Sequence, residues 1–517
     1  MSEEQTVRYV RMTCQTDDPV REKAYLDFVE NLEPVIKKKL FELDKKFLSA
    51  KPRQDLPREQ YWVLNRQREN NVALFREENI ELEKEETILG QKYQKTTGAW
   101  TVTYDGKERT MQQMAQYLEE TDRAVREKTW KLTEERRARD RGALDELYDE
   151  MLALRARIAQ NCGFDNYRDY MFRKLNRFDY TPKDCVTYHE AVEKHIVPLM
   201  RKMDERRAHK IGVSPLRPWD LAVDPEGRRP LRPFKSTAEL ASGCKKIFEK
   251  VHPALARDFD QMIRLSLLEL ESRKGKAPGG YNSELMEVRL PFIFMNSVGR
   301  DIDLRTLLHE SGHAFHVFAT RNANLHWMYR ERGVPIEFAE VASQGMDLIA
   351  GDHLEGIFYN HEEAMRSMRE NAESIVRLLA WVATIDAFQH WVYTNPGHSV
   401  ERRRDQWDKL KQRFGGGESY RGGYEDVWQS RWQRQLHLYL VPFYYIEYGI
   451  ALLGALGLWT RYRKDPAGAL KAYMNSLTLG GSKPLPELFK SAGVPFDFGP
   501  RTVEPYAKEL GSVLMKD

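Results

Sequence analysis

Three histidines and one glutamate lie within one short stretch of this chain, 306-TLLHESGHAFHVF-318. His309 and His313 are four residues apart, and on a helix this spacing places both imidazoles on one face, where they can bind one metal ion. Glu310 lies between them and can act as a general base toward water. The HExxH pattern is typical of zinc peptidases. The stretch therefore predicts a zinc-binding helix, and the structural alternative is a buried helix with hydrogen-bonded histidines.

A third metal ligand must come from elsewhere, because a catalytic zinc usually has three protein ligands and one open position. The next predicted helix, within 333-GVPIEFAEVASQGMDLIA-350, carries Glu337 and Glu340 one turn apart. Either carboxylate can face the histidines, and the spacing does not choose between them. His316, one turn beyond His313, is predicted to pack or to support a ligand rather than to bind the metal.

Other catalytic patterns fit the sequence less well. A di-iron helical bundle needs two inward-facing ExxH pairs. The Glu249–His252 pair is formally a second one, but Pro253 follows it and interrupts the helix. The sequence also has no GxSxG and no GxxxxGK[ST] motif. Metal-dependent hydrolysis is the chemistry that the sequence favours.

Composition excludes several classes of partner. The 517 residues are 41% hydrophobic and 31% charged, typical of a globular protein with a large core. With 81 basic and 78 acidic side chains the net charge is only +3, so we expect neither nucleic acid nor a membrane as partner. The four cysteines form no CxxC pair and the N-terminus has no apolar signal-like segment, so we expect a cytoplasmic protein.

Helical spacing covers most of the chain, with two exceptions. Alternating residues around Asp105-Gly106 in 97-TGAWTVTYDGKERTM-111 predict a small hairpin. The segment 288-VRLPFIFMN-296 predicts a strand, and Pro291, which has no N–H, suggests an edge strand. The apolar run 438–459 is long enough to cross a bilayer, but Pro442, Glu447 and its four tyrosines favour a buried helix that lines a cleft. The prediction is a mainly α protein with a small sheet near the histidines.

Several separate blocks together resemble the thimet oligopeptidase and oligoendopeptidase F family of zinc metallopeptidases, and oligoendopeptidase F in particular. The blocks are LLHESGHAFH with the following EFAEVASQ, 272-SRKGKAPGGY-281, 291-PFIFMN-296 and 437-HLYLVPFYYIEY-448. The resemblance covers roughly residues 160–510. It implies a helical ellipsoid that is split by a deep substrate channel. Residues 1–155 would form part of one channel wall, and residues 156–517 the catalytic domain.

The resemblance also implies a set of roles for individual residues. It implies one Zn²⁺ per chain, with His309, His313 and Glu340 as ligands and Glu310 as the base. It thus selects Glu340 over Glu337. His437 and Tyr448 would stabilise the oxyanion. The substrate-binding residues would be Tyr444 and, on a strand that pairs with the peptide, Phe292, Phe294 and Asn296.

The predicted function is a zinc endo-oligopeptidase that cleaves internal bonds of short, unstructured peptides. One alternative is a zinc carboxypeptidase or dipeptidase of related helical fold. Such an enzyme needs a cation for the C-terminal carboxylate of its substrate, for which Arg332 and Arg421 are candidates. The other alternative is a non-catalytic peptide-binding protein, although such a protein has no use for Glu310.

Overall fold

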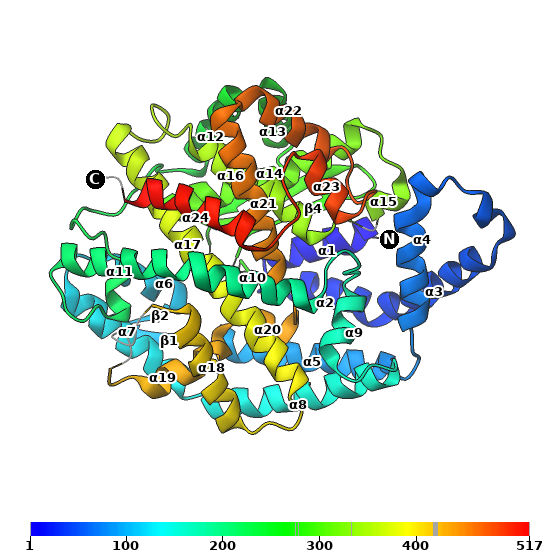
Figure 1. Ribbon diagram of the computed structural model, residues 1–517, viewed down its shortest axis with the longest axis horizontal. Helices are drawn as coiled ribbons and strands as arrows, with labels where there is room; N and C mark the ends of the chain where they lie inside the picture. The colour runs from blue at the N-terminus through cyan, green and yellow to red at the C-terminus, as the bar shows by residue number, and fades with distance from the viewer. Residues whose placement is uncertain (1, 274–275, 278, 332, 417–421, 516–517) are drawn as a thin grey trace. The chain divides into compact units, whose positions relative to one another are not determined.

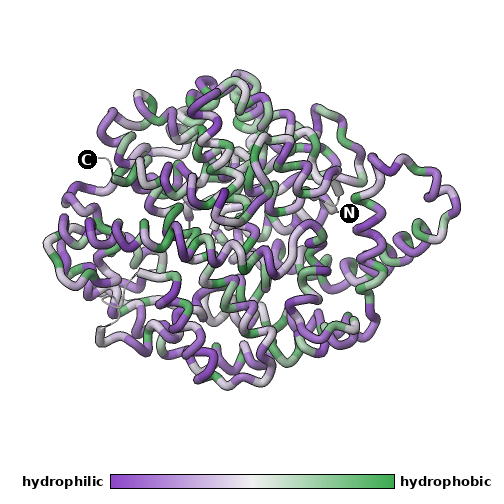
Figure 2. The backbone as a smooth tube through the Cα atoms, in the orientation of Figure 1, coloured by the Kyte–Doolittle hydropathy of each residue, from purple (hydrophilic) through white to green (hydrophobic). Residues whose placement is uncertain are grey.

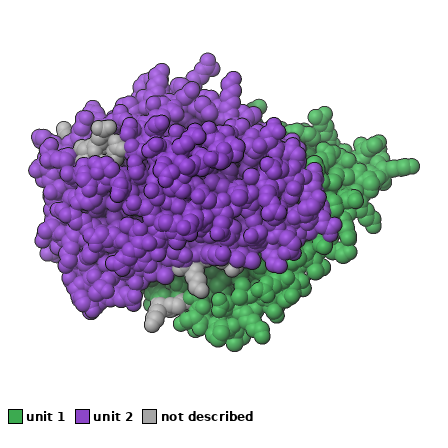
Figure 3. Space-filling view, turned by 90° about the horizontal axis from the view of Figure 1, so that it is seen from below, with its two compact units in different colours: residues 1–73, 231–371, 450–497 green, residues 74–230, 372–449, 498–517 purple. Residues whose placement is uncertain are grey.

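Two compact units make up the chain, and each is assembled from three segments of sequence (Figure 3). The computed structural model describes residues 2–273, 276–277, 279–331, 333–416 and 422–515. Unit 1 comprises residues 1–73, 231–371 and 450–497; unit 2 comprises residues 74–230, 372–449 and 498–517. The division into residues 1–155 and 156–517, and the substrate channel, stay predictions.

Both units are mainly helical, as predicted (Figure 1). The helices of unit 1 are α1 (Ser2–Cys14), α2 (Pro19–Asp27), the π-helical turn η1 (Phe28–Leu32), α3 (Glu33–Ser49), η2 (Lys51–Asp55), α4 (Arg58–Leu74), α12 (Thr237–Val251), α13 (Pro253–Arg264), α14 (Asp301–Asn322), α15 (Trp327–Glu331), α16 (Ile336–Gly351), α22 (Pro466–Leu477) and α23 (Leu485–Ser491).

The helices of unit 2 are α5 (Asn79–Gly98), α6 (Met111–Ala115), η3 (Gln116–Glu119), α7 (Arg123–Ala138), α8 (Arg141–Asn161), α9 (Tyr167–Lys174), α10 (Pro182–His195), α11 (Val197–Ile211), η4 (Pro218–Asp220), α18 (Val400–Phe414), α19 (Glu425–Ser430), η6 (Arg431–Arg434), α20 (Leu436–Leu440) and α24 (Pro500–Leu514). Two long helices contain a boundary between the units: α17 (His361–Thr394) and α21 (Tyr445–Lys464).

The predicted hairpin is confirmed in unit 2. Strands β1 (Thr101–Tyr104) and β2 (Lys107–Thr110) pair antiparallel, with Tyr104 opposite Lys107. The two residues between them, Asp105 and Gly106, both have positive φ, 49° and 72°. This is the backbone of a two-residue type I′ turn, which Asp-Gly favours.

The prediction of an edge strand around Pro291 is wrong. Strand β5 (Leu290–Ser297) is the central strand of the sheet in unit 1, between β3 (Leu268–Glu271), which is parallel to it, and β4 (Tyr281–Leu285), which is antiparallel. The Ile293 N–H donates to the Leu267 carbonyl at 2.9 Å, so by strand alternation the nitrogen of Pro291 faces the same side. Pairing with β3 starts only at Ile293, so the missing N–H of Pro291 removes no hydrogen bond between β3 and β5.

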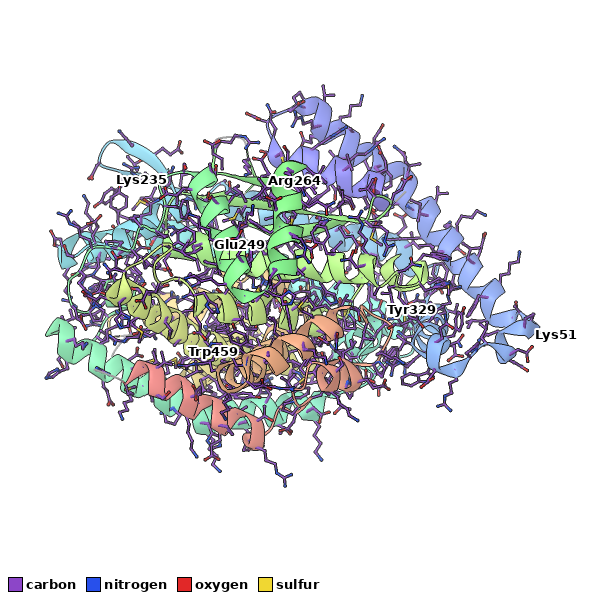
Figure 4. All side chains as sticks on the ribbon, turned by 90° about the horizontal axis from the view of Figure 1, so that it is seen from above. Lys51, Lys235, Glu249, Arg264, Tyr329 and Trp459 are labelled. Carbon is purple, nitrogen blue, oxygen red and sulfur yellow. The ribbon has the colours of Figure 1, made fainter. Side chains whose placement is uncertain are left out.

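The sheet lies beside the helix that carries the HExxH stretch, as predicted. Both β4 and β5 pack against α14, and α14 packs most extensively on α16. Helices α12 and α13 also contact α14. Figure 4 labels Glu249 on α12, which ends at Val251. His252 has an extended backbone and caps α13 through its Nδ1, so Glu249 and His252 do not share a helix, as Pro253 predicted.

The apolar run 438–459 is divided between α20 and α21. Its residues Ile446, Ile450 and Leu456 are at most 1% exposed, so the prediction of a buried helix is confirmed. Within the described parts of the chain, no helix has the length and apolarity that crossing a membrane requires. By contrast, Figure 2 shows largely hydrophilic residues along α3 and α4.

Candidate functional site

Helix α14 has a well-defined start. Asp303 Oδ2 accepts hydrogen bonds from the N–H groups of Arg300 at 2.9 Å and Val298 at 2.7 Å. Asp301 and Asp303 place two negative charges in the first turn, where the helix dipole favours them. These contacts fix the register of the 22-residue helix on which the HExxH residues lie.

A glycine inside this helix allows α14 and α16 to approach at backbone distance. A Cβ atom on Gly312 would lie 2.5 Å from the Ala342 carbonyl oxygen and 2.6 Å from the Ser343 Cα. Both neighbours are main-chain atoms, which cannot move aside as a flexible side chain can. Only glycine therefore allows this approach, which brings Glu340 of α16 beside His309 and His313 of α14.

Three candidate ligand atoms converge between these two helices, from His309, His313 and Glu340. They all lie within 4.8 Å of one another. His309 Nε2 is 3.3 Å from Glu340 Oε2, and His313 Nε2 is 3.8 Å from Glu340 Oε1. The two imidazole rings lie nearly perpendicular, with centroids 5.2 Å apart. The side chains of His309 and His313 are 27% and 20% exposed, so the group is open to solvent.

The Glu340 carboxylate gives this group of side chains an affinity for positive charge. Burial opposes protonation of His309, but the hydrogen bond and the charge of Glu340 outweigh it and raise the pKa of His309 to about 9. Burial lowers the pKa of His313 to about 4. Glu340 is itself buried, yet its contacts with His309 and His313 hold its pKa well below the usual value. Glu340 thus attracts positive charge to its position between the two imidazoles.

Glu310 is a buried carboxyl group with an unused oxygen. Only 7% of the residue is exposed, and its Oε2 has no hydrogen-bond partner among the described residues. Burial is the main cause that raises the pKa of Glu310 to about 7; the charge of His309 opposes it and that of Glu340 adds to it. A carboxyl group with such a pKa can both accept and release a proton near neutral pH.

The residues present fit a zinc ion. Two imidazole nitrogens and one carboxylate oxygen are the donor set of many catalytic zinc sites. Ser343 Oγ donates to Glu340 Oε2 at 3.0 Å and leaves Oε1 available. Glu310 directly follows His309 in the sequence. A water molecule bound to the metal would be a hydrogen-bond partner for the Glu310 Oε2 atom.

Two further candidates from the sequence are not part of this group. His316 is 4% exposed and packs edge-on against the Phe338 ring, with centroids 6.1 Å apart. Glu337 is buried one turn before Glu340. Neither contributes a ligand atom to either of the two metal-type clusters among the described residues, of which the other is Cys185, Asp386 and His390.

Of the three predicted substrate-binding residues of β5, Phe294 is buried, and Phe292 and Asn296 are half-buried. Phe294 is fully buried and stacks on Tyr281, with ring centroids 4.7 Å apart. Asn296 donates from Nδ2 to the carbonyls of Ala277 and Gly279. Because β5 has a strand on each side, a peptide cannot add to it. Arg332 and Arg421, the candidate carboxylate-binding residues, lie outside the described residues.

In unit 2, an aromatic cluster forms around His437. The centroid of its ring lies 6.0 Å from that of Tyr444, 4.8 Å from that of Tyr445 and 5.9 Å from that of Tyr448. Tyr445, which is not among the predicted site residues, is thus also in the cluster. All four residues are half-buried. Burial lowers the pKa of His437 to about 4, so its imidazole is neutral at physiological pH.

A strained turn brings these rings together. Phe443, between α20 and α21, has a φ of 66°, which costs a bulky residue on the order of 1–3 kcal/mol. Its N–H donates to Gln389 Oε1 at 2.6 Å, and its carbonyl accepts from Arg177. Arg177 also forms a buried ion pair with Glu447, 2.8 Å long. These contacts hold the strained conformation.

Gln435 determines which nitrogen of His437 carries the proton. The Trp381 Nε1–H can only donate, so the oxygen of Gln435 accepts from it at 2.9 Å. The amide nitrogen of Gln435 must then donate to His437 Nδ1, 2.7 Å away. The neutral imidazole therefore carries its proton on Nε2 and presents that nitrogen as a donor.

Comparison with known proteins places this chain in a family. Residues 116–498 match the sequence profile of Peptidase family M3. The chain belongs to peptidase family M3. The resemblance to this group of zinc peptidases is thereby confirmed for most of the chain.

Curated relatives of this M3 peptidase include oligopeptidases. It is 25% identical over 260 residues to oligopeptidase PepF of Bacillus subtilis, covering 48% of this chain and 38% of the relative. It is 23% identical over 324 residues to the plasmid-encoded oligoendopeptidase F of Lactococcus lactis subsp. cremoris, covering 59% of this chain and 49% of the relative. The chain thus matches less than half the length of either protein.

Solved structures match over nearly the whole chain. A structure of Pz peptidase A with an inhibitor has a TM-score of 0.91 and 28% identity, covering 99% of this chain and 90% of the other. Oligoendopeptidase F from Enterococcus faecium has a TM-score of 0.69 at 16% identity, covering 99% and 88%, and this likeness concerns the fold alone. The mainly helical fold is that of M3 peptidases.

Proposed function

We propose that this M3 peptidase is a zinc-dependent endo-oligopeptidase that binds one Zn²⁺ per chain through His309, His313 and Glu340. The observation that carries the proposal is the buried, orphaned carboxyl oxygen of Glu310 beside a solvent-open group of zinc-type ligands. A structural metal site has no need of such a carboxyl group, whereas hydrolysis requires a base at this position.

Glu310 moves the proton in the proposed reaction. When bound, zinc polarises the scissile carbonyl and makes water a better nucleophile at neutral pH. Glu310 accepts the proton of the attacking water and passes it to the nitrogen of the leaving amine. Its pKa of about 7 suits both steps, because the same group is a base in the first and an acid in the second.

His437 and Tyr448 are the proposed donors to the oxyanion. The proton on Nε2 of His437 and the hydroxyl of Tyr448 are hydrogen-bond donors on neighbouring rings. A neutral donor suits this role, because it needs no change of protonation during the reaction. Tyr444, in the same cluster, is proposed to contact the peptide.

The proposed substrates are short, unstructured peptides. An extended peptide can add a strand to an existing sheet only at an outer strand. We place this role on β4 instead of β5, since β4 is an outer strand and all its residues are half-exposed. Asn282 of β4 also approaches the Glu310 carbonyl, with its Nδ2 3.5 Å away, so β4 lies next to the HExxH turn.

Product mapping tests the proposal. The zinc-loaded protein is incubated with a mixed set of peptides of five to fifteen residues, each with free ends and with acetylated and amidated ends, and products are identified by mass spectrometry. We expect internal cleavage of both forms. Folded proteins added as controls should stay intact.

Two other outcomes would contradict the proposal. Cleavage confined to peptides with a free C-terminus would identify a carboxypeptidase. Stoichiometric peptide binding without any cleavage by the zinc-loaded protein would identify a non-catalytic peptide-binding protein.

A further inference from the structure

A second candidate site lies entirely within unit 2. Residues of α11, α17, α18, α19 and η6 enclose a cavity of about 560 Å³, a volume typical of pockets that bind small ligands. Trp381 and Trp428 form its aromatic walls, and Leu221 and Phe414 contribute apolar surface. We call it the tryptophan–arginine pocket.

Cationic side chains dominate this pocket. Five of them line it, and none of the described lining residues is acidic; the five are Arg201, Arg377, Lys411, Arg431 and Arg434. Arg201 and Arg434 are exposed and the other three are half-buried. Such a concentration of one sign of charge in a concave site attracts anions.

The two tryptophans hold several of these cations in place. The Lys411 Nζ lies 5.1 Å from the ring centroid of Trp381 and 5.9 Å from that of Trp428. The guanidinium carbon of Arg431 lies 4.5 Å from the Trp428 centroid, and that of Arg434 lies 5.8 Å from the Trp381 centroid. Stacking on an aromatic face restricts the orientation of a cation, so the rings hold these charges at the wall of the pocket.

Two acidic residues interact with cations of this pocket or lie close to them. Asp204 accepts from Arg377 at 2.6 Å. Glu134 forms an ion pair with Arg137, 2.6 Å long. The charges of Arg431 and Arg434 also stabilise the ionised form of Glu134. One glutamate thus faces three arginines.

One wall of the pocket is hydrogen-bonded to the proposed substrate-contacting residues. Trp381, on which Arg434 stacks, donates to Gln435, and Gln435 donates to His437. The pocket and the His437 cluster are therefore two hydrogen bonds apart. The pocket wall and the His437 cluster thus belong to one hydrogen-bonded chain within unit 2.

We propose that the tryptophan–arginine pocket binds a carboxylate of the peptide substrate, either its C-terminal group or an acidic side chain. This inference rests on the proposed function. Arginine forms paired hydrogen bonds with a carboxylate, and such charge-assisted contacts are worth roughly a tenfold to hundredfold change in affinity. The protein would then prefer peptides with an anionic end to otherwise identical neutral peptides.

Four peptides with the same internal sequence test this inference. They combine a C-terminal acid or amide with Asp or Asn at the penultimate position, and kcat/KM is measured for each. In the wild type we expect the acidic forms to exceed the neutral form by roughly tenfold or more. Arg434→Gln should lower this ratio toward one, because its side chain is exposed in the pocket. The acid–amide and the Asp–Asn pairs show which carboxylate is bound.

Arg402→Gln is the matched control, because Arg402 is exposed on α18 and does not line the pocket. We expect it to keep the wild-type ratio. An equal loss in Arg434→Gln on acidic and neutral peptides would overturn the inference, since it would indicate an indirect effect through Trp381 and Gln435. So would an unchanged ratio.

Calorimetry on the zinc-free protein separates this inference from the proposed function. If the zinc-loaded protein cleaves none of the four peptides, the proposed function fails, yet acidic peptides should still bind more tightly than the neutral one and lose this advantage in Arg434→Gln. Inorganic phosphate is the third ligand tested. Equal binding of acidic and neutral peptides, with phosphate bound at the same site, would identify a site for inorganic anions and overturn the inference.

Discussion

Two clusters in this protein have nearly the same composition and a different environment. The α14–α16 cluster in unit 1 consists of His309, His313 and Glu340. The α10–α17 cluster in unit 2 consists of Cys185, His189, Asp386 and His390. Each places three candidate ligand atoms within 4.8 Å of one another, and each contains a pair of potential ligands four residues apart on one helix.

Access to solvent separates the two clusters. Their carboxylate–imidazole distances are similar: 3.3 Å and 3.8 Å from Glu340 to His309 and His313, and 2.8 Å and 3.2 Å from Asp386 to His189 and His390. The side chains of His189, Asp386 and His390 are 4%, 0% and 11% exposed.

Residue types alone therefore do not define a metal site. The carboxylate of Asp386 lies between two imidazoles and is shielded from water, so its interactions stabilise the packing of α10 on α17. The carboxylate of Glu340 faces two half-exposed imidazoles, and an ion can reach it. We interpret the α10–α17 cluster as structural and the α14–α16 cluster as the site of chemistry.

Removing one histidine from each cluster is the strongest test of this comparison. We expect His313→Ala to lose its zinc and to show only background hydrolysis, because two ligands do not retain the ion. The matched variant His390→Ala should keep one zinc per chain. Metal analysis by mass spectrometry and a peptide assay measure both effects. Two zinc ions in the wild type, or zinc loss in His390→Ala, would contradict the comparison.

Removing the proposed base Glu310 while keeping the three zinc ligands should separate zinc binding from peptide hydrolysis. In Glu310→Gln we expect full zinc content and turnover that is lower by about 10²–10⁴-fold, since the amide cannot accept a proton. Zinc content is measured on the same sample as kcat. Wild-type turnover in this variant would show that another group is the base.

The tyrosine cluster should matter for turnover but not for metal binding. Tyr448→Phe removes one hydroxyl donor, and we expect turnover to fall by roughly 10²–10³-fold with zinc content and melting temperature unchanged. Tyr445→Phe is the neighbouring control. If Tyr445→Phe were the more damaging variant, the donor to the oxyanion would have to be reassigned.

A carboxylate in place of the Gln435 amide should change the protonation of His437. In Gln435→Glu the new acceptor holds a proton on Nδ1 and raises the pKa of His437 from about 4. We expect turnover to fall about tenfold at neutral pH, and the loss of activity on acidification to begin at a higher pH than in the wild type. The pH profile of kcat measures this. Gln435→Ala should lower turnover without this shift.

The smallest effect on turnover is expected in the structural cluster. Asp386→Ala removes the hydrogen-bond partner of the buried His189 and the charge partner of His390, so we expect the free energy of unfolding to fall by about 3 kcal/mol while zinc content and kcat stay unchanged. Urea denaturation measures the first quantity. A loss of turnover comparable to that of Tyr448→Phe would show that the cluster has a part in catalysis.

The stability of the wild type should depend on pH more strongly than that of Asp386→Ala, because only the wild type carries the charge of Asp386. Burial favours its neutral form, but the charge of His390 and the hydrogen bonds of His189 and His390 hold the pKa of Asp386 below its usual value. Its stabilising contribution is thus present above the unfolded-state pKa of about 3.9 and is lost as the pH falls below it. The wild type should lose more stability than Asp386→Ala between pH 6 and pH 3.

The sequence predicts the histidine pair of the α14–α16 cluster because the geometry of the pair is local. The spacing of His309 and His313 fixes their common face once a helix forms. Glu340 needed the family resemblance, since nothing in the spacing distinguishes it from Glu337. A glycine within a regular helical pattern signals close approach of another backbone, and this signal could have identified Gly312.

Features that depend on distant segments were not predictable in this way. The position of β5 in the centre of the sheet depends on where β3 begins, and Pro291 by itself suggested the opposite. The α10–α17 cluster joins residues about two hundred positions apart in the sequence. The role of Gln435 in orienting the proton of His437 depends on its contacts with Trp381 and His437, which form only in the folded chain.

The contact at Gly312 has a consequence for metal selectivity. Because main-chain atoms of α14 and α16 touch there, the separation of the two helices is set by atomic radii rather than by adaptable side chains. The distance from the histidines on one helix to the carboxylate on the other is then nearly constant. A larger side chain at this position would widen the gap between ligands, and the protein would come to favour a larger cation over zinc.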